Sequence, residues 1–467
     1  MTTRAAEGVA GLPAAGWGVP RIPSLTGLRL RPATAIRAAL LLLVVGNLGR
    51  FPIAAIGAKD APILFNDVLV VALLAAGALA GARARAWRLD FPALLALGFA
   101  FVGGVSAALA VPRFGLSGTE LAFSLAYLVR WLAYFGVYLV VINTVRLEDV
   151  GPVWEALEAA LLVLAGFGIL QSLFLPGFAQ IVYPESVRYV DWDPQGHRLV
   201  STILDPNLVG SLLVLGLLVM LARLSVGART RLWKPLVLLT ALVLTMSRGS
   251  LFSLVVGGLV ILGARGLSRR LVRWAALAGV LALPFVPALI RMALTYHRLA
   301  VTDPSAMTRV ADWLRGLTVL AGNPVIGIGF NTYGFVQRAY GWTAVGKGTF
   351  GVAGGLLFAA VMTGFVGLAL YLAMVWLVLR RCRRIWRERS RPAEQRGLAV
   401  GVSAATVAVL VSSLFTNAMF FPFVMEPLWV LWGLSFVIGA AVEGLEPNGR
   451  LPAPIVATLP AAAGRPG

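Results

Sequence analysis

The sequence predicts an all-α integral membrane protein with about twelve transmembrane helices. Of its 467 residues, 59% are hydrophobic and only 13% are charged, and the mean hydropathy is +0.86. Soluble domains are about a quarter charged, so this composition excludes a soluble enzyme. The apolar residues also form long runs separated by short loops that carry arginine, which is typical of a polytopic membrane protein.

Twelve apolar windows predict these helices. They lie near residues 38–56, 62–82, 91–111, 121–145, 152–175, 208–222, 232–246, 249–264, 272–290, 352–379, 398–414 and 423–442. The seventh and eighth windows could also form one long helix, and charge decides between the two arrangements. With twelve helices and a cytoplasmic N-terminus, 27 of the 40 basic residues lie in inner segments and 12 in outer ones, as the positive-inside rule expects. We therefore expect a tight outward turn at residues 247–249.

The windows divide the chain into three parts. Residues 1–37 form a cytoplasmic N-terminal tail, residues 38–443 a polytopic transmembrane domain, and residues 444–467 a cytoplasmic C-terminal tail. The N-terminal tail lacks the compact apolar core and cleavage site of a signal peptide, so the first helix is the expected anchor. Two longer outer loops are predicted, at 176–206 and, before the tenth helix, at 291–351.

The second outer loop contains a predicted amphipathic helix. Asp303 and Pro304 make an N-cap and first-turn pair, and Gly322, Asn323 and Pro324 end the helix. Apolar residues recur on one face between these limits: Val310, Trp313, Leu314, Leu317 and Leu320. We expect this helix to lie over the membrane or over the helical bundle.

The composition also limits the chemistry. The chain has one cysteine, Cys382, and two histidines, which excludes a thiolate cluster and argues against a histidine metal site. We therefore expect no metal and no cofactor. The net charge of +20 could indicate nucleic-acid binding, but the basic residues lie in loops between helices. We expect the lipid bilayer, and no nucleic acid, as a partner.

The segment at the outer entrance of the sixth helix is the first candidate site. Arg198 offers a planar fork of donors suited to phosphate oxygens, and the amides that follow Asp205 and Pro206 add the positive end of a helix. These features fit an anion site. The alternative is that Asp205 and Asn207 only cap and start the sixth helix.

Two further arginines lie at or within the membrane. Arg248 follows Ser247 in the expected outward turn, where it is either a second anion contact or a side chain that extends to the lipid headgroups. Arg130 is near the middle of the fourth helix, where an unpaired arginine costs roughly 2.5–3.5 kcal/mol. Asp67 in the second helix is a candidate partner, so Arg130 has either a structural or a catalytic role.

Four short motifs, in this order, resemble the O-antigen ligase and polymerase family. They are Arg198 with Asp205, Pro206 and Asn207; residues 244–249; Arg309 with Trp313 and the run 324–330, which includes Gly327 and Gly329; and residues 363–368. The two glycines permit a close approach of backbone. The resemblance covers roughly residues 190–380, and the twelve-helix order with a large outer loop before the tenth helix agrees with it.

The resemblance implies a GT-C-like glycosyltransferase of surface-polysaccharide or lipopolysaccharide biosynthesis. Its donor would be a glycan linked to undecaprenyl pyrophosphate, on the outer side of the bacterial inner (plasma) membrane. The acceptor would be a glycolipid or a growing glycan. Arg198 and Arg248 would hold the pyrophosphate and stabilise its charge as it leaves, without a metal, and Arg309 would belong to the same outer cavity.

The chain departs from the family pattern at one position. Ligases have a histidine about ten residues before the Thr–Gly pair of the tenth helix, as a base for the acceptor hydroxyl, and the corresponding residue here is Ala353. Side chains that could replace it lie in the outer loops: His197, His297, Asp191, Asp193 and Asp205. Each of them could instead be a solvated loop residue. The missing histidine favours a polymerase or another polysaccharide transferase over a ligase.

A lipid-linked oligosaccharide flippase or a polysaccharide exporter is the competing function, because it would also need a cationic cavity. The short loops, the single large outer loop and the lack of visible inverted halves favour the enzyme.

Overall fold

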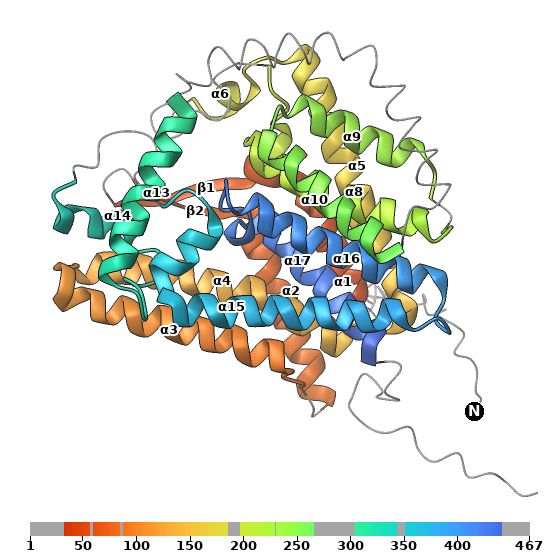
Figure 1. Cartoon of the computed structure of the whole chain (residues 1–467), viewed down its shortest axis with the longest axis horizontal. Helices are drawn as coiled ribbons and strands as arrows, with labels where there is room; N and C mark the ends of the chain where they lie inside the picture. The colour runs from red at the N-terminus through yellow and green to blue at the C-terminus, as the bar shows by residue number, and fades with distance from the viewer. Residues whose placement is uncertain are drawn as a thin grey trace, which may run out of the picture. The chain divides into compact units, whose positions relative to one another are not determined.

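The computed structural model describes residues 32–56, 59–84, 87–184, 197–228, 230–265, 304–342 and 351–440. These residues are mainly helical (Figure 1). The helices that match the expected spans are α1 (Pro32–Leu42), α2 (Phe65–Ala84), α3 (Phe91–Phe114), α4 (Gly118–Thr144), α5 (Val150–Phe174), α8 (Pro206–Ser225), α9 (Trp233–Leu244), α10 (Arg248–Arg265), α15 (Gly355–Arg387), α16 (Ala393–Ser412) and α17 (Pro422–Ala440). Shorter elements join them: η2 (Leu43–Gly49), η3 (Leu147–Asp149), α6 (Phe178–Val182), η4 (Ser201–Ile203), α14 (Tyr333–Val336), η6 (Gln337–Tyr340) and η7 (Ala418–Phe420).

Eight helical segments of the described residues are long and apolar enough to cross a membrane. Three shorter apolar helices, Phe65–Leu79, Trp233–Leu244 and Arg248–Ala264, match further expected spans. The ninth expected span, residues 272–290, lies outside the described residues, so the number twelve stays a prediction. The class of a helical, multi-pass membrane protein is confirmed.

The first expected span is wrong in its second half, where a β-hairpin replaces the helix. Strand β1 (Arg50–Ile56) pairs antiparallel with β2 (Lys59–Leu64). The helical path ends earlier, because Gly46 adopts φ 53° inside η2 and because prolines in both strands remove amide donors that a helix would use. Asn47 fixes this end by donating to the Ile203 carbonyl at 2.6 Å.

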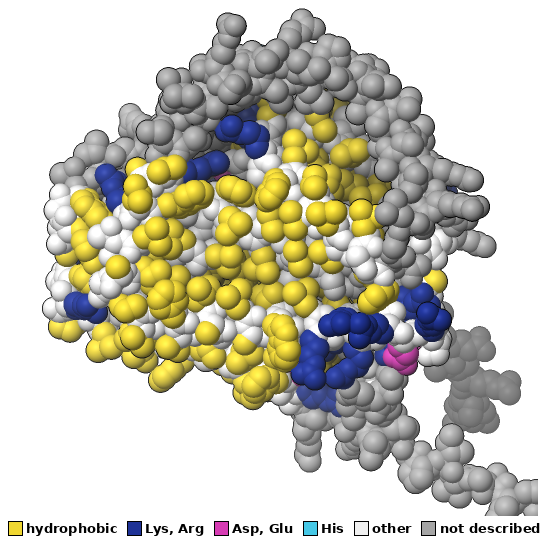
Figure 2. Space-filling model, in the orientation of Figure 1, with side chains coloured by type: hydrophobic (Ala, Val, Ile, Leu, Met, Phe, Trp, Pro, Cys, Tyr) yellow, Lys and Arg dark blue, Asp and Glu magenta, His cyan; other side chains and the backbone are white. Residues whose placement is uncertain are grey.

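The apolar face of the bundle carries few charges. Figure 2 shows hydrophobic side chains over most of the visible face, with lysine and arginine side chains around its borders. Inside the bundle, Arg130 pairs with Asp67 through two hydrogen bonds of 2.8 and 2.6 Å. The predicted ion pair between Arg130 and Asp67 is therefore confirmed, and both charges are compensated within the protein.

The helix ends gather in two groups that we name by one arginine each. At the Arg198 end, the start of α8 meets the junction of α9 and α10 and the end of α16. At the Arg384 end, the start of α3, the end of α15 and the end of α17 line one cavity. The alternating direction of successive helices produces this division, and it matches the alternation assumed in the sequence analysis.

The predicted amphipathic helix is present as α13 (Pro304–Gly322). It starts and ends where the cap and stop residues predict, although Asp303 itself lies outside the described residues. It packs against α15, and a side chain in place of Gly316 would meet Val352. Three residues of its apolar stripe are exposed, Val310, Leu314 and Leu317. The helix thus lies over the bundle and still presents an apolar strip outward.

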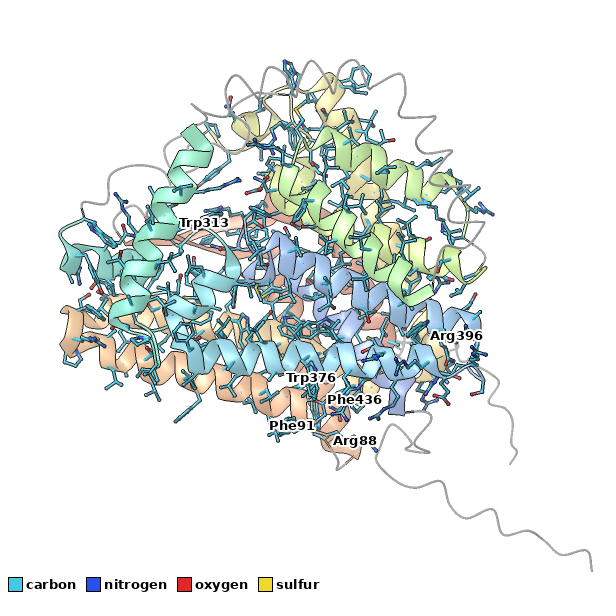
Figure 3. The ribbon with its side chains drawn as sticks, viewed as in Figure 1. Arg88, Phe91, Trp313, Trp376, Arg396 and Phe436 are labelled. Carbon is cyan, nitrogen blue, oxygen red and sulfur yellow. The ribbon has the colours of Figure 1, made fainter. Side chains whose placement is uncertain are left out.

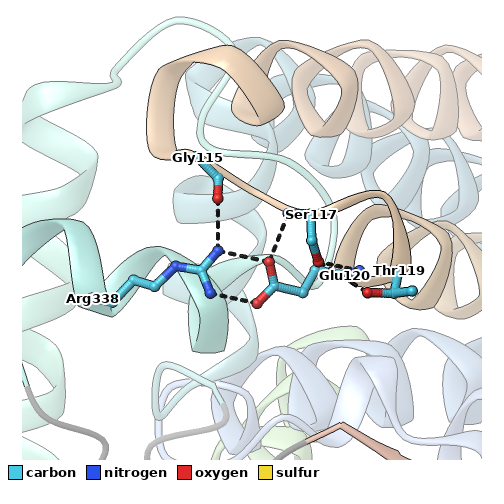
Figure 4. A network of polar contacts seen from close by, with 5 residues as sticks. All are labelled: Gly115, Ser117, Thr119, Glu120 and Arg338. Atoms are coloured by element: carbon cyan, nitrogen blue, oxygen red, sulfur yellow. Dashed lines mark hydrogen bonds and ion pairs between the residues drawn. The ribbon is translucent and has the colours of Figure 1, made fainter.

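The segment after α13 is pinned to the turn between α3 and α4 (Figure 4). Arg338 donates two hydrogen bonds of 2.6 Å to the Glu120 carboxylate and a third, of 2.9 Å, to the Gly115 carbonyl. Hydrogen bonding and the charge of Glu120 raise the pKa of Arg338, so the arginine keeps its charge. This bidentate pair fixes the described end of the large outer loop at the Arg198 end.

Candidate active site

The segment before α8 is a tight turn held by the end of α5. Its turn η4 (Ser201–Ile203) begins with Ser201 at φ 48° and is followed by Leu204 at φ 61°, so two non-glycine residues adopt left-handed backbone here. Gln171 Oε1 accepts hydrogen bonds from two amides of this turn, at 2.9 and 3.2 Å. Backbone of this kind persists only where neighbouring contacts fix it, often at functional sites. The turn is a fixed platform for Arg198, which precedes it.

Asp205 follows the turn and begins α8. Its Oδ1 accepts from the amides of Asn207 and Leu208 at 2.8 and 3.1 Å, so it is the N-cap, as the structural alternative predicted. Burial raises the pKa of the Asp205 carboxyl, while its amide partners and the charges of Arg198 and Arg309 lower it. Both predicted arginines therefore lie close enough to Asp205 to act on it electrostatically.

The junction between α9 and α10 is a real break in the helical path. Met246 has φ 52°, Thr245 Oγ1 accepts from the Ser247 amide at 3.2 Å, and Ser247 Oγ accepts from the Ser250 amide at 3.4 Å. Two helices, as predicted from charge, are confirmed over one long helix. Arg248 is the first residue of α10, and its side chain is exposed.

The two motif segments meet at this junction. Arg198 Nε donates to the Thr245 carbonyl at 2.9 Å, and Arg198 Nη2 lies 3.5 Å from Asn207 Oδ1. Ser247 Oγ donates to the same Asn207 oxygen at 3.0 Å. The predicted residues Arg198, Asn207 and Ser247 thus form one hydrogen-bonded group, with Arg248 next to it in the chain.

A row of hydroxyl groups extends this group toward α16, and the sequence analysis missed it. Ser211 Oγ lies 2.6 Å from Ser412 Oγ, and Ser412 Oγ lies 3.4 Å from Thr416 Oγ1. Ser211 and Ser250 also donate to the Asn207 carbonyl, at 2.9 and 3.3 Å. The only indication of this row in the sequence is the presence of serines inside otherwise apolar helices. The sequence does not say which helices would bring them together.

The glycine-rich run, residues 324–330, has a structural role that its sequence did not reveal. Gly364 adopts φ 64° and breaks α15, and a Cβ there would lie 2.1 Å from the Val325 carbonyl oxygen. A Cβ at Gly327, which has φ 72°, would lie 2.5 Å from the carbonyl carbon of Met362. Four backbone hydrogen bonds of 2.8–3.1 Å close the gap, joining Ile328 to Val361, Gly329 to Met362, Phe365 to Pro324 and Val366 to Val325. The run therefore satisfies the polar groups that the break exposes.

Ala353 lies just before α15, beside the loop that follows α16. The Gly355 amide donates to the Thr416 carbonyl at 2.9 Å, and a Cβ at Gly354 would lie 2.8 Å from the Leu414 carbonyl oxygen. Since Thr416 also belongs to the hydroxyl row, the expected histidine position and Arg198 are at the same end of the bundle. The methyl group of Ala353 cannot accept a proton.

The remaining candidate bases divide into described and undescribed residues. The side chain of His197 is exposed, and its carbonyl accepts from Ser172 Oγ at 2.7 Å. His297, Asp191 and Asp193 lie outside the described residues. Two candidate bases, His197 and Asp205, thus lie among the described residues. Asp205 is occupied as the N-cap of α8, whereas His197 is exposed and directly precedes Arg198 in the chain.

The middle of the chain is similar to a known protein family. Residues 235–372 match the family model described as O-antigen ligase. The matched stretch contains Ser247, Arg248 and Arg309, the glycine-rich run and the break at Gly364, and it leaves out Arg198. The resemblance predicted from the sequence is confirmed by this match. No curated protein matches the chain.

Proposed function

We propose that this multi-pass membrane protein, whose residues 235–372 match the O-antigen ligase family, transfers or polymerises glycan from undecaprenyl pyrophosphate without a metal. The acceptor is a glycolipid or a growing glycan of a surface polysaccharide. One observation supports this most. The arginine and amide groups of two distant motifs, Arg198 with Asn207 and the turn before Arg248, form one hydrogen-bonded group.

The chemistry requires charge stabilisation and a proton acceptor. The acceptor hydroxyl oxygen forms a bond to the anomeric carbon of the donor sugar as that carbon loses its bond to the pyrophosphate oxygen. The pyrophosphate leaves with the bonding electrons, and Arg198, Arg248 and Arg309 stabilise its growing charge. The Thr245 carbonyl and Asn207 keep Arg198 in place, so little reorganisation is needed during the reaction.

The proton of the acceptor hydroxyl passes to a base, and we assign this role to His197. His197 is exposed and directly precedes Arg198 in the chain, and an imidazole suits general-base work near neutral pH. His297, Asp191 and Asp193 are the alternatives in the outer loops. With Ala353 in place of the ligase histidine, we favour the polymerase reaction over the ligase reaction.

The membrane orientation follows from the arginine distribution. We place the Arg384 end in the cytoplasm of a bacterium, with both tails, because short basic loops stay inside. The Arg198 end then faces the periplasmic side of the inner membrane. Twelve helices in a GT-C-like arrangement, with outer loops 176–206 and 291–351, complete this proposal.

Purified protein in liposomes tests the proposed reaction. With an undecaprenyl-pyrophosphate-linked glycan as donor, we expect longer or transferred glycan chains and release of the pyrophosphate lipid. Arg248→Ala should lower the rate about 100-fold or more, the usual effect of losing one charge-stabilising group. Arg315→Ala is the matched control, since Arg315 stacks on Trp342 outside the Arg198 group. Movement of the lipid-linked glycan across the bilayer without new glycosidic bonds would instead identify a flippase.

A further inference from the structure

A second basic site lies at the Arg384 end, remote from the residues of the proposed reaction. A cavity of about 340 Å³ opens there between α3, α15 and α17. Its charged lining consists of Arg380, Arg381, Arg384, Arg391 and Glu388. Figure 3 shows Phe91, Trp376 and Phe436 near one another at this side of the bundle, and two of them, Phe91 and Phe436, line the cavity.

Among the described residues that line this cavity, four are arginines and one is a carboxylate. Arg391 donates to the Glu388 carboxylate at 2.7 Å, so these two charges offset each other. Arg381 is held by the Asp90 carboxylate at 3.4 Å and by the Phe436 ring, whose centroid lies 4.5 Å from the guanidinium carbon. One nitrogen of Arg381, Nη1, is buried without a hydrogen-bond partner in the described part of the chain. Arg380 and Arg384 also line the cavity.

The same cavity borders the apolar face of the bundle. Arg380 stacks on Trp376 with its guanidinium carbon 5.3 Å from the ring centroid, and Trp376 is 56% exposed. Figure 2 places a dense group of basic side chains at the lower border of the hydrophobic face. Tryptophan at such a border is typical of the membrane interface. A ligand there meets cationic and apolar groups together.

We propose that this cavity binds the phosphate headgroup of an anionic membrane lipid. The lipid phosphate accepts hydrogen bonds from Arg381, Arg380 and Arg384, and its acyl chains lie along Leu377 and Phe91. Basic pockets between transmembrane helices bind such headgroups because arginine donors match phosphate oxygens in a partly dry site. The apolar border favours a lipid over inorganic phosphate, because inorganic phosphate has no apolar part that could pack against it. The cavity volume fits a headgroup and not a whole lipid.

Native mass spectrometry of the full-length, delipidated protein tests the site. Phosphatidylglycerol should bind more tightly than phosphatidylcholine. The double variant Arg380→Gln/Arg384→Gln should bind phosphatidylglycerol roughly 30-fold more weakly, since each arginine at an anionic lipid surface contributes about 1 kcal/mol and each 1.4 kcal/mol is a factor of ten. Arg383→Gln/Arg387→Gln is the matched control, with equal charge and spacing on the same helix. Its arginines line a different cavity.

Each outcome decides the proposal. A loss confined to the Arg380/Arg384 pair supports it, and an equal loss in both pairs shows general attraction to basic helix ends and overturns it. Inorganic phosphate that competes fully at millimolar concentration also overturns it, because the apolar border would then be irrelevant. If the double variant fails to fold, Leu377→Trp fills the cavity without changing charge and should lower the affinity by a similar factor. Unchanged binding in a folded Leu377→Trp protein contradicts the assignment.

Discussion

Arginines are concentrated at both ends of the bundle, but the two ends hold them differently. At the Arg198 end they come from three segments far apart in the sequence, and Arg198 is fixed by a backbone carbonyl and an amide oxygen beside a strained turn. At the Arg384 end the arginines come from successive turns of α15 and the loop after it, and they lie against aromatic rings and single carboxylates. The first arrangement fixes geometry, and the second mainly concentrates charge.

This difference suggests two kinds of anion recognition in one protein. A reaction needs its charged groups at set positions around the leaving group, so the fold uses distant segments and unusual backbone to place them. A lipid headgroup needs only enough positive charge at the right depth, which one helix end supplies. A change from arginine to lysine, which keeps charge and removes the planar fork, should separate the two.

The largest expected effect is at the Arg198 end. Arg198→Lys should lower glycan transfer by about 10²–10³-fold, because lysine cannot contact the Thr245 carbonyl and Asn207 together while facing the pyrophosphate. Arg380→Lys/Arg384→Lys should keep phosphatidylglycerol affinity within about threefold of wild type. The liposome assay measures the transfer rate, and native mass spectrometry measures the phosphatidylglycerol affinity. Equal losses at both ends would remove the distinction between geometry and charge.

The arginine that belongs to neither end should affect stability most. Asp67→Asn leaves Arg130 without its carboxylate in the interior, and we expect a loss of about 2 kcal/mol in the free energy of unfolding. This is below the value for a fully buried pair, because both side chains are 18% exposed. Unfolding in mixed micelles measures it. Asp67→Leu/Arg130→Met should recover most of the loss, and a double variant as unstable as the single one would argue against a simple ion pair.

Apolar runs, caps and charge bias predicted much of this fold. They located the long helices of the described residues, the ends of α13, the break before Arg248 and the Arg130–Asp67 pair. Each of these depends on local sequence or on one charge in an apolar span. The β-hairpin was missed because the apolar run of the first expected span looks like one continuous helix. Gly46 and the strand prolines end the helix within that run. The hydroxyl row was missed because Ser211 and Ser412 are neighbours only through helix packing.

The glycine-rich run of the Arg198 end offers a smaller test, of stability and not of anion binding. Gly364→Ala should destabilise the protein by about 1–2 kcal/mol, because alanine at φ 64° is strained and its Cβ would overlap the Val325 carbonyl. Gly258→Ala in α10 is the control, since that glycine has open space around its Cβ position and alanine favours a helix. Thermal unfolding in detergent compares them. An unchanged Gly364→Ala protein would show that the pairing of the run with α15 is dispensable.

The smallest effect is a pH dependence of α13 at the same end. Burial raises the pKa of Asp312 to about 6, against the opposing effect of Arg315. The folded state therefore binds a proton more tightly than the unfolded state, and the carboxyl destabilises the fold at pH values above 6. This cost fades as the pH falls from 6 toward 4.

Asp312→Asn should raise the unfolding free energy by roughly 1 kcal/mol at pH 7.5, a value reduced for partial exposure. The gain should shrink at pH 4.5, whereas Glu148→Gln at an exposed site should give no such trend. A gain for Asp312→Asn that is equal at both pH values would mean that lost packing or charge repulsion, and not proton binding, is responsible.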